Sequence, residues 1–108
     1  MSYKALSAED IRNLEATPYR EFLRRPGMSL GLYRLPAGGT DGQHPHASDE
    51  VYIVQSGKAR LVIEGEGIDV GPGSVVSVDQ GREHAFTDIT EDLSIIVVFA
   101  PPDDPDDD

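Results

Sequence analysis

Short apolar segments separated by turn residues fill most of this chain and limit the folds it can adopt. From residue 50 onward these segments read EVYIVQ, ARLVIE, GIDV, SVVSV, EHAFT and LSIIVVFA, and glycine stands at four of the five boundaries between them. Many short strands at close spacing, with glycine at the turns, are typical of an antiparallel sandwich or a small barrel. The sequence therefore predicts an all-β domain.

The first 35 residues predict one helix followed by a hairpin. Ser7 and Asp10 form a capping-box pattern and Thr17-Pro18 ends the run, so we expect a short helix over 8–16. YREFLR and MSLGLYRL flank Pro26-Gly27, which favours a hairpin over 19–35 closed by a type II turn. At 108 residues the chain is expected to form one domain.

Composition excludes several classes of site and partner. The chain has no cysteine, so any metal must be held by nitrogen and oxygen ligands. A formal net charge of −11 repels phosphate backbones and anionic lipids, so we expect no nucleic-acid partner and no membrane partner. MSYKALSAED lacks the apolar run of a signal peptide, and we expect a soluble, cytoplasmic protein. The residues DDPDDD, 103–108, predict a disordered acidic tail.

Two of the three histidines lie one residue apart in HPHASDE. On an extended segment His44 and His46 would point to the same side, and Glu50 would keep that parity. Two imidazoles and a carboxylate on one face suit a borderline divalent metal. The alternative is that these are ordinary loop histidines and a solvated glutamate, which is common for an isolated pair of this kind.

The residues around this pair resemble the two motifs of the cupin superfamily. The first motif, G-x5-H-x-H-x3-4-E-x6-G, is matched at all its fixed positions by Gly38, His44, His46, Glu50 and Gly57. The glycines and histidine of the second motif, G-x5-P-x-G-x2-H-x3-N, are matched by Gly73, Gly81 and His84. Asp79 and Asp88 depart from the proline and asparagine that are usual there, which affects turn and capping geometry at the barrel rim.

The resemblance implies a fold and a metal site. It implies a cupin double-stranded β-helix, a small jelly-roll barrel over 28–102, with metal ligands His44, His46, Glu50 and His84. Iron, manganese, nickel, zinc, copper and cobalt all suit such ligands. Glu50 and Tyr52 are the candidate catalytic residues, and plain barrel core is the alternative for Tyr52. Arg34 and Arg60 are weaker candidates for receiving an acidic substrate.

The resemblance leaves the function open among several classes. It favours a metal-dependent enzyme of oxygenase type acting on a small polar or aromatic molecule. The alternatives are a sugar or uronate isomerase or ring-opening enzyme, and a non-catalytic, metal-dependent module that binds small molecules. We also expect a homodimer, in which residues 1–27 pack on or exchange with a partner barrel, because apolar Tyr19, Phe22 and Leu23 need cover.

Overall fold

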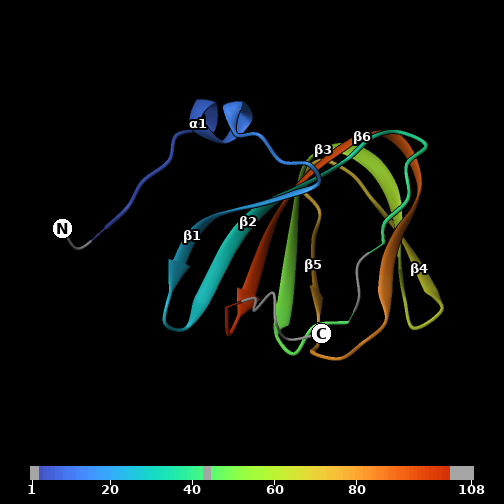
Figure 1. Cartoon of the computed structure of the whole chain (residues 1–108). Helices are drawn as coiled ribbons and strands as arrows, with labels where there is room; N and C mark the ends of the chain where they lie inside the picture. The colour runs from blue at the N-terminus through green and yellow to red at the C-terminus, as the bar shows by residue number, and fades with distance from the viewer. Residues whose placement is uncertain (1–2, 43–44, 103–108) are drawn as a thin grey trace.

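The structure is a computed structural model that describes residues 3–42 and 45–102. Its elements, in chain order, are α1 (Ala8–Asn13), β1 (Tyr19–Arg25), β2 (Met28–Leu35), β3 (Asp49–Ile63), β4 (Glu66–Val70), β5 (Val75–Val78) and β6 (His84–Ala100). The strands pair antiparallel in the order β1-β2-β6-β3-β4, and β5 also pairs with β3. The predicted all-β fold with one short N-terminal helix is confirmed (Figure 1).

The long strands β3 and β6 bend, and the bend folds the sheet over itself. Their pairing register shifts between Val54 and Arg60. The first half of β3 and the last half of β6 therefore lie with β1, β2 and β5, whereas their other halves lie with β4 (Figure 1). The sequence predicts EVYIVQ and ARLVIE as separate strands, and EHAFT and LSIIVVFA likewise. That prediction is wrong, because each pair forms one long strand that bulges kink without ending it.

Gly57 lies at the bend in β3, where the backbone conformation and a close contact both require glycine. Its φ is +92°, a value that side chains with a Cβ rarely adopt. A Cβ at this position would lie 2.2 Å from the carbonyl oxygen of Asp92 on the facing part of β6. The two long strands can cross this closely only where one of them has no side chain.

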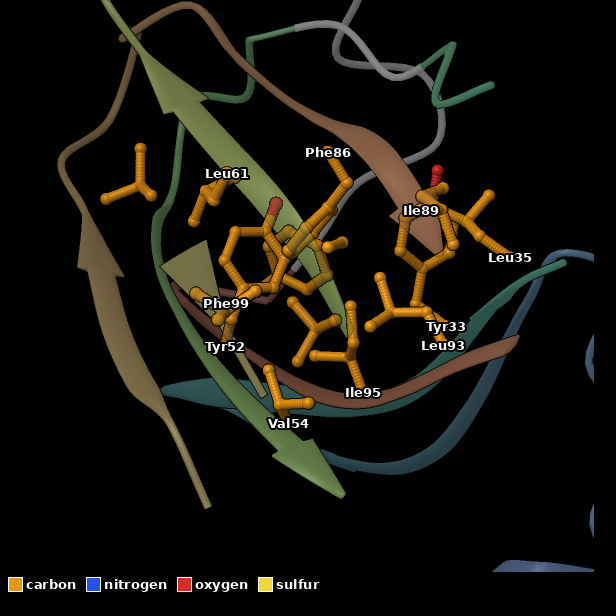
Figure 2. Packing of buried hydrophobic residues seen from close by; sticks show 14 residues of the cluster. Tyr33, Leu35, Tyr52, Val54, Leu61, Phe86, Ile89, Leu93, Ile95 and Phe99 are labelled. Carbon is orange, nitrogen blue, oxygen red and sulfur yellow. The ribbon is translucent and has the colours of Figure 1, made fainter. Parts of the chain in front are cut away.

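The hydrophobic core lies between the two halves of the folded sheet (Figure 2). Alternate residues of the strands face inward, as a half-buried sheet requires. The rings of Tyr52 and Phe86 lie 5.0 Å apart, edge to face, and both side chains are buried. The alternation of inward and outward positions along the strands predicts that Tyr52, Phe86, Ile95, Val97 and Phe99 face inward, and all five belong to this core.

Helix α1 is attached to the sheet through its C-terminal end. Its capping box is present, with the Ser7 hydroxyl accepting from the Asp10 N–H at 3.0 Å. The helix ends at Asn13, three residues earlier than predicted, because Leu14 has extended backbone angles. The guanidinium of Arg34 on β2 donates to the carbonyls of Arg12 at 2.9 Å, of Ile11 at 3.3 Å and of Leu14, which satisfies the groups that a helix end leaves unpaired.

Two further predictions have different outcomes. The β1–β2 hairpin is confirmed, with Arg25 opposite Met28. Its turn is not of type II, because Gly27 lacks the positive φ that such a turn requires at that position.

The predicted acidic tail, 103–108, lies outside the described residues. None of the helices in the described ranges is long and apolar enough to span a bilayer.

Candidate metal centre

Glu50 and His84 meet inside the folded sheet. Glu50 is the second residue of β3 and His84 is the first residue of β6. Their side chains are only 2% and 1% exposed, and His84 Nε2 lies 2.9 Å from Glu50 Oε2. The carboxylate and the imidazole are thus held together out of contact with water, although 34 positions separate them in the sequence.

The hydrogen bond on the other side of the His84 ring determines which nitrogen carries the proton. Nδ1 lies 2.8 Å from the backbone carbonyl oxygen of Arg82, and a carbonyl can only accept, so Nδ1 is the donor. In the neutral ring Nε2 then presents a lone pair toward Glu50. Although Glu50 Oε2 is near, Nε2 has no partner in a favourable hydrogen-bond direction among the described residues. A backbone carbonyl orienting one ring nitrogen while the other stays available is typical of metal-binding histidines.

The electrostatics of this position favour a cation. Burial alone would lower the pKa of the His84 imidazole, but the Glu50 carboxylate beside it, the hydrogen bond to the Arg82 carbonyl and the charge of Asp41 raise it above its ordinary value of 6.5. The surroundings therefore stabilise positive charge between the imidazole and the carboxylate. A divalent metal ion supplies such a charge, so these donors fit one.

His46 approaches the same carboxylate from the loop before β3. Its Nε2 lies 4.0 Å from Glu50 Oε1, and its ring packs 5.2 Å from that of Phe99. Its carbonyl accepts from the N–H of Gly81 at 2.8 Å, and Gly81 can make this contact with a φ of +75°. His46 lies in the loop and not in a strand, and this loop directs it toward Glu50; whether it shares a side with His44 stays a prediction, because His44 lies outside the described residues.

The described part of the candidate centre is not a closed ligand set. His46 and His84 each approach the Glu50 carboxylate, while His44 lies outside the described residues. Among residues 3–42 and 45–102, no group of three or more histidine, aspartate or glutamate side chains is arranged to hold a metal ion by itself. His84 Nε2 lies 2.9 Å from Glu50 Oε2, whereas His46 Nε2 lies 4.0 Å from Glu50 Oε1.

Tyr52 contacts the candidate centre directly. Its hydroxyl donates to Glu50 Oε1 at 3.3 Å, and its ring lies 5.8 Å from that of His84. The side chain is 1% exposed and also belongs to the core, so the two interpretations of Tyr52 are not exclusive. Figure 2 shows Tyr52 within the packed core, where its ring meets that of Phe86.

Asp41 and Tyr33 are polar residues near the centre that sequence reasoning misses. Asp41 precedes the histidine pair, and its Oδ2 accepts from the backbone N–H of Phe86 on β6 at 2.9 Å. Its Oδ1 accepts from the hydroxyl of Tyr33 on β2. Burial, with this hydrogen bond and the charge of Asp41, raises the pKa of Tyr33, so the phenol keeps its proton. The sequence offers one signal for this network, namely that Asp41 is a carboxylate between Gly38 and His44 of the first motif.

The two arginines considered for an acidic substrate do not reach the centre. Arg34 is used at the end of α1, and Arg60 is exposed with its Nη1 3.4 Å from Asp69. A cleft of about 1310 Å³ lies between α1, the end of β2 and the loop after it. Tyr33 lines this cleft, but of the described candidate ligands neither His46, Glu50 nor His84 does, so the cleft is a separate feature.

Comparison with known sequences identifies relatives along most of the chain. The family model described as Cupin domain matches residues 31–99. An uncharacterized protein of Streptomyces coelicolor is 53% identical over 98 residues, which is 91% of each chain. An L-ectoine synthase of Bordetella petrii is 24% identical over 98 residues, covering 87% of this chain and 74% of the relative.

Solved structures share the same fold at low sequence identity. The protein TT1209 from Thermus thermophilus superposes with a TM-score of 0.76 and 20% identity, over 93% of this chain and 99% of that one. A cupin protein from Bacteroides fragilis has a TM-score of 0.73 and 20% identity, over 94% of this chain and 86% of that one. At such identity the likeness concerns the fold alone.

Proposed function

We propose that this chain, which belongs to the cupin domain family, is a metal-dependent enzyme that acts on a small polar or aromatic molecule, with chemistry of oxygenase type. One observation carries the proposal: Glu50 is buried between His46 and His84, and the Nε2 atom of His84 is oriented toward it with no hydrogen-bond partner among the described residues. We propose His44, His46, Glu50 and His84 as the ligands. When bound, the metal supplies a Lewis acid and an open position for water or substrate.

The residues around the carboxylate have roles of their own in this proposal. Tyr52 donates to Glu50, which holds the carboxylate in place and offers a proton at the hydroxyl oxygen. The rings of Phe86 and Phe99 are buried beside the centre and exclude water from it. Glu50 and Tyr52 are therefore the proposed catalytic residues, and the buried surroundings suit a small, partly aromatic ligand.

The alternatives differ in what the same site would do. A sugar or uronate isomerase or ring-opening enzyme would convert its substrate without using oxygen. A non-catalytic module would bind a metal and a ligand without turnover. The likeness to an L-ectoine synthase favours an enzyme over a module, but at 24% identity it does not identify the reaction.

Metal analysis followed by a substrate screen separates these functions. Protein reconstituted with iron, manganese, nickel, zinc, copper or cobalt in turn is expected to retain about one equivalent of at least one metal. The loaded protein is then screened against small phenols, polar aromatic compounds, sugars and uronates, with oxygen uptake and product formation by NMR as readouts. Glu50→Gln, which keeps the shape of the side chain, should abolish turnover.

The outcomes point to different functions. Oxygen uptake with product supports the proposal, whereas product without oxygen uptake would replace it with an isomerase. Metal and ligand binding without product would indicate a module. No retained metal in any reconstitution would contradict all three.

We propose that the functional form is a homodimer formed through the outer face of β2, β6 and β3. Pairing places Leu30, Val98 and Val51 side by side on that face, and all three are half-buried apolar residues. Residues 1–27 carry five lysines and arginines against four acidic residues, whereas the rest of the chain carries four against sixteen, so residues 1–27 can approach the acidic surface of a second copy with little charge repulsion. Exchange of residues 1–27 between barrels stays a prediction.

Light scattering tests the dimer. The wild-type chain is expected at twice its mass of 11.7 kDa at micromolar concentration. Val98→Glu places a charge in the proposed interface and should give the monomer mass. Val75→Glu is the matched control, because Val75 is 64% exposed on β5 and outside the proposed interface. A wild-type monomer, or a Val98→Glu dimer, would contradict this interface.

A further inference from the structure

Every lysine and arginine of this chain lies within the described residues, so the positions of all nine are known. Eight of the nine are exposed: Lys4, Arg12, Arg20, Arg24, Arg25, Lys58, Arg60 and Arg82. The ninth, Arg34, is half-buried, and it donates to the carbonyl groups at the end of α1. None of these nine side chains is buried in the core beside Glu50 and His84.

Arg82 lies only two residues before His84, so the direction of its side chain matters most. Its backbone carbonyl binds the His84 ring, but its side chain is 59% exposed. Its Nη1 lies 3.6 Å from Glu64 Oε1, in the turn between β3 and β4. The guanidinium therefore points away from the candidate centre, and the interior formed by the described residues holds no lysine or arginine side chain.

The polar groups that do surround the centre are anionic or neutral. Glu50 and Asp41 supply carboxylates: Glu50 is buried beside His84, and Asp41 accepts from the backbone N–H of Phe86 at 2.9 Å. Tyr33 and Tyr52 supply hydroxyl groups. Hydroxyls and carboxylates can accept from an ammonium or a hydroxyl group, and aromatic faces attract cations. A buried anion with no cationic partner, in contrast, is strongly disfavoured.

From this distribution of charge, we infer that the proposed site accepts molecules with at most one anionic group, the group that reaches the metal. The rest of the molecule must be neutral or cationic. The inference rests on the proposed metal centre and narrows its substrate class. It excludes dicarboxylates and sugar phosphates whose second anionic group would lie in the interior, and it retains alcohols, phenols, amines and monocarboxylates.

Three matched four-carbon acids test this inference. Protein loaded with Co²⁺ is titrated at pH 7.5 with butyrate, 4-aminobutyrate and succinate, which differ only in the group at the far end. The visible absorption of Co²⁺ reports entry of each acid beside the metal. We expect butyrate and 4-aminobutyrate to bind with similar dissociation constants, and succinate at least about tenfold more weakly. Equal or tighter binding of succinate would overturn the inference.

Two controls distinguish the interior from the charge of the whole protein. At 0.5 M NaCl the long-range field of a chain with net charge −11 is largely screened, so discrimination arising in the interior should persist. Loss of the discrimination between succinate and butyrate at this salt concentration would overturn the inference. Arg82→Gln should leave the ratio of succinate to butyrate affinity unchanged, and further weakening of succinate would show that Arg82 reaches the ligand.

Metal content is measured before each titration, so that two kinds of failure remain distinct. Absence of bound Co²⁺ after reconstitution would remove the proposed centre and the inference with it. Bound Co²⁺ together with tight succinate binding would leave the metal centre intact and overturn only the charge selectivity.

Discussion

His84→Ala is expected to leave a folded β protein that has lost its metal. The imidazole is one of two buried groups facing each other at 2.9 Å, and alanine removes a nitrogen that nothing else in that part of the core replaces. Loss of an outer hydrogen-bond partner alone typically weakens metal affinity by about 10- to 100-fold, so loss of a ligand should exceed that range. Metal binding stabilises only the folded chain, so added metal should no longer raise the melting temperature of the variant.

Elemental analysis after reconstitution and dialysis is the measurement, with circular dichroism to establish folding. His46→Ala should behave in the same way, and His84→Gln serves as a second, bulkier variant if alanine destabilises the core. Asp88→Asn is the matched control: Asp88 has a φ of +48°, which asparagine tolerates, and it lies in β6 four residues beyond His84. Metal content in His84→Ala equal to that of the wild type would remove His84 from the proposed ligands.

The fold was predictable from the sequence because its signals are local. Alternating apolar residues specify which side of a strand faces inward, and Tyr52 and Phe86 therefore lie where they were expected. The continuity of β3 and β6 was not predictable in the same way. Gly57 looks like the end of a strand in the sequence, yet its role is to let β3 approach the Asp92 carbonyl closely, a contact made across 35 positions of chain. Such contacts exist only after the sheet has folded.

The same distinction applies to the candidate centre. The spacing of His46, Glu50 and His84 matches a known pattern, which makes them predictable from the sequence, and the structure brings both histidines to the Glu50 carboxylate. Arg34 was considered for a substrate because a strand arginine can point either way, and only the position of α1 shows which partner it takes. The polar network of Asp41 is not predictable from the sequence, because its partners lie 8 and 45 positions away.

Asp41→Asn is expected to weaken metal binding by about 10- to 100-fold while the chain stays folded. The Asp41 carboxylate joins the segment that carries the histidine pair to both halves of the sheet, through the Tyr33 hydroxyl on β2 and the Phe86 N–H on β6. An asparagine amide has only one acceptor oxygen, so it can keep one of these two bonds and leaves the other donor unpaired. The loop that presents His46 would then lose one of its attachments, and Asp41 is therefore a positioning residue.

The measurements are the dissociation constant for Co²⁺ and the melting temperature of the metal-free protein, each compared with those of two further variants. Tyr33→Phe keeps the ring but removes one of the two donors, so it should weaken metal binding less than Asp41→Asn. Asp69→Asn makes the same chemical change on an exposed side chain paired with Arg60, and it should alter neither quantity. A purely structural role would lower the melting temperature while leaving the dissociation constant unchanged at temperatures where the variant is folded. That result would refute the positioning role, because the role requires that the loop held by Asp41 present His46 to the metal.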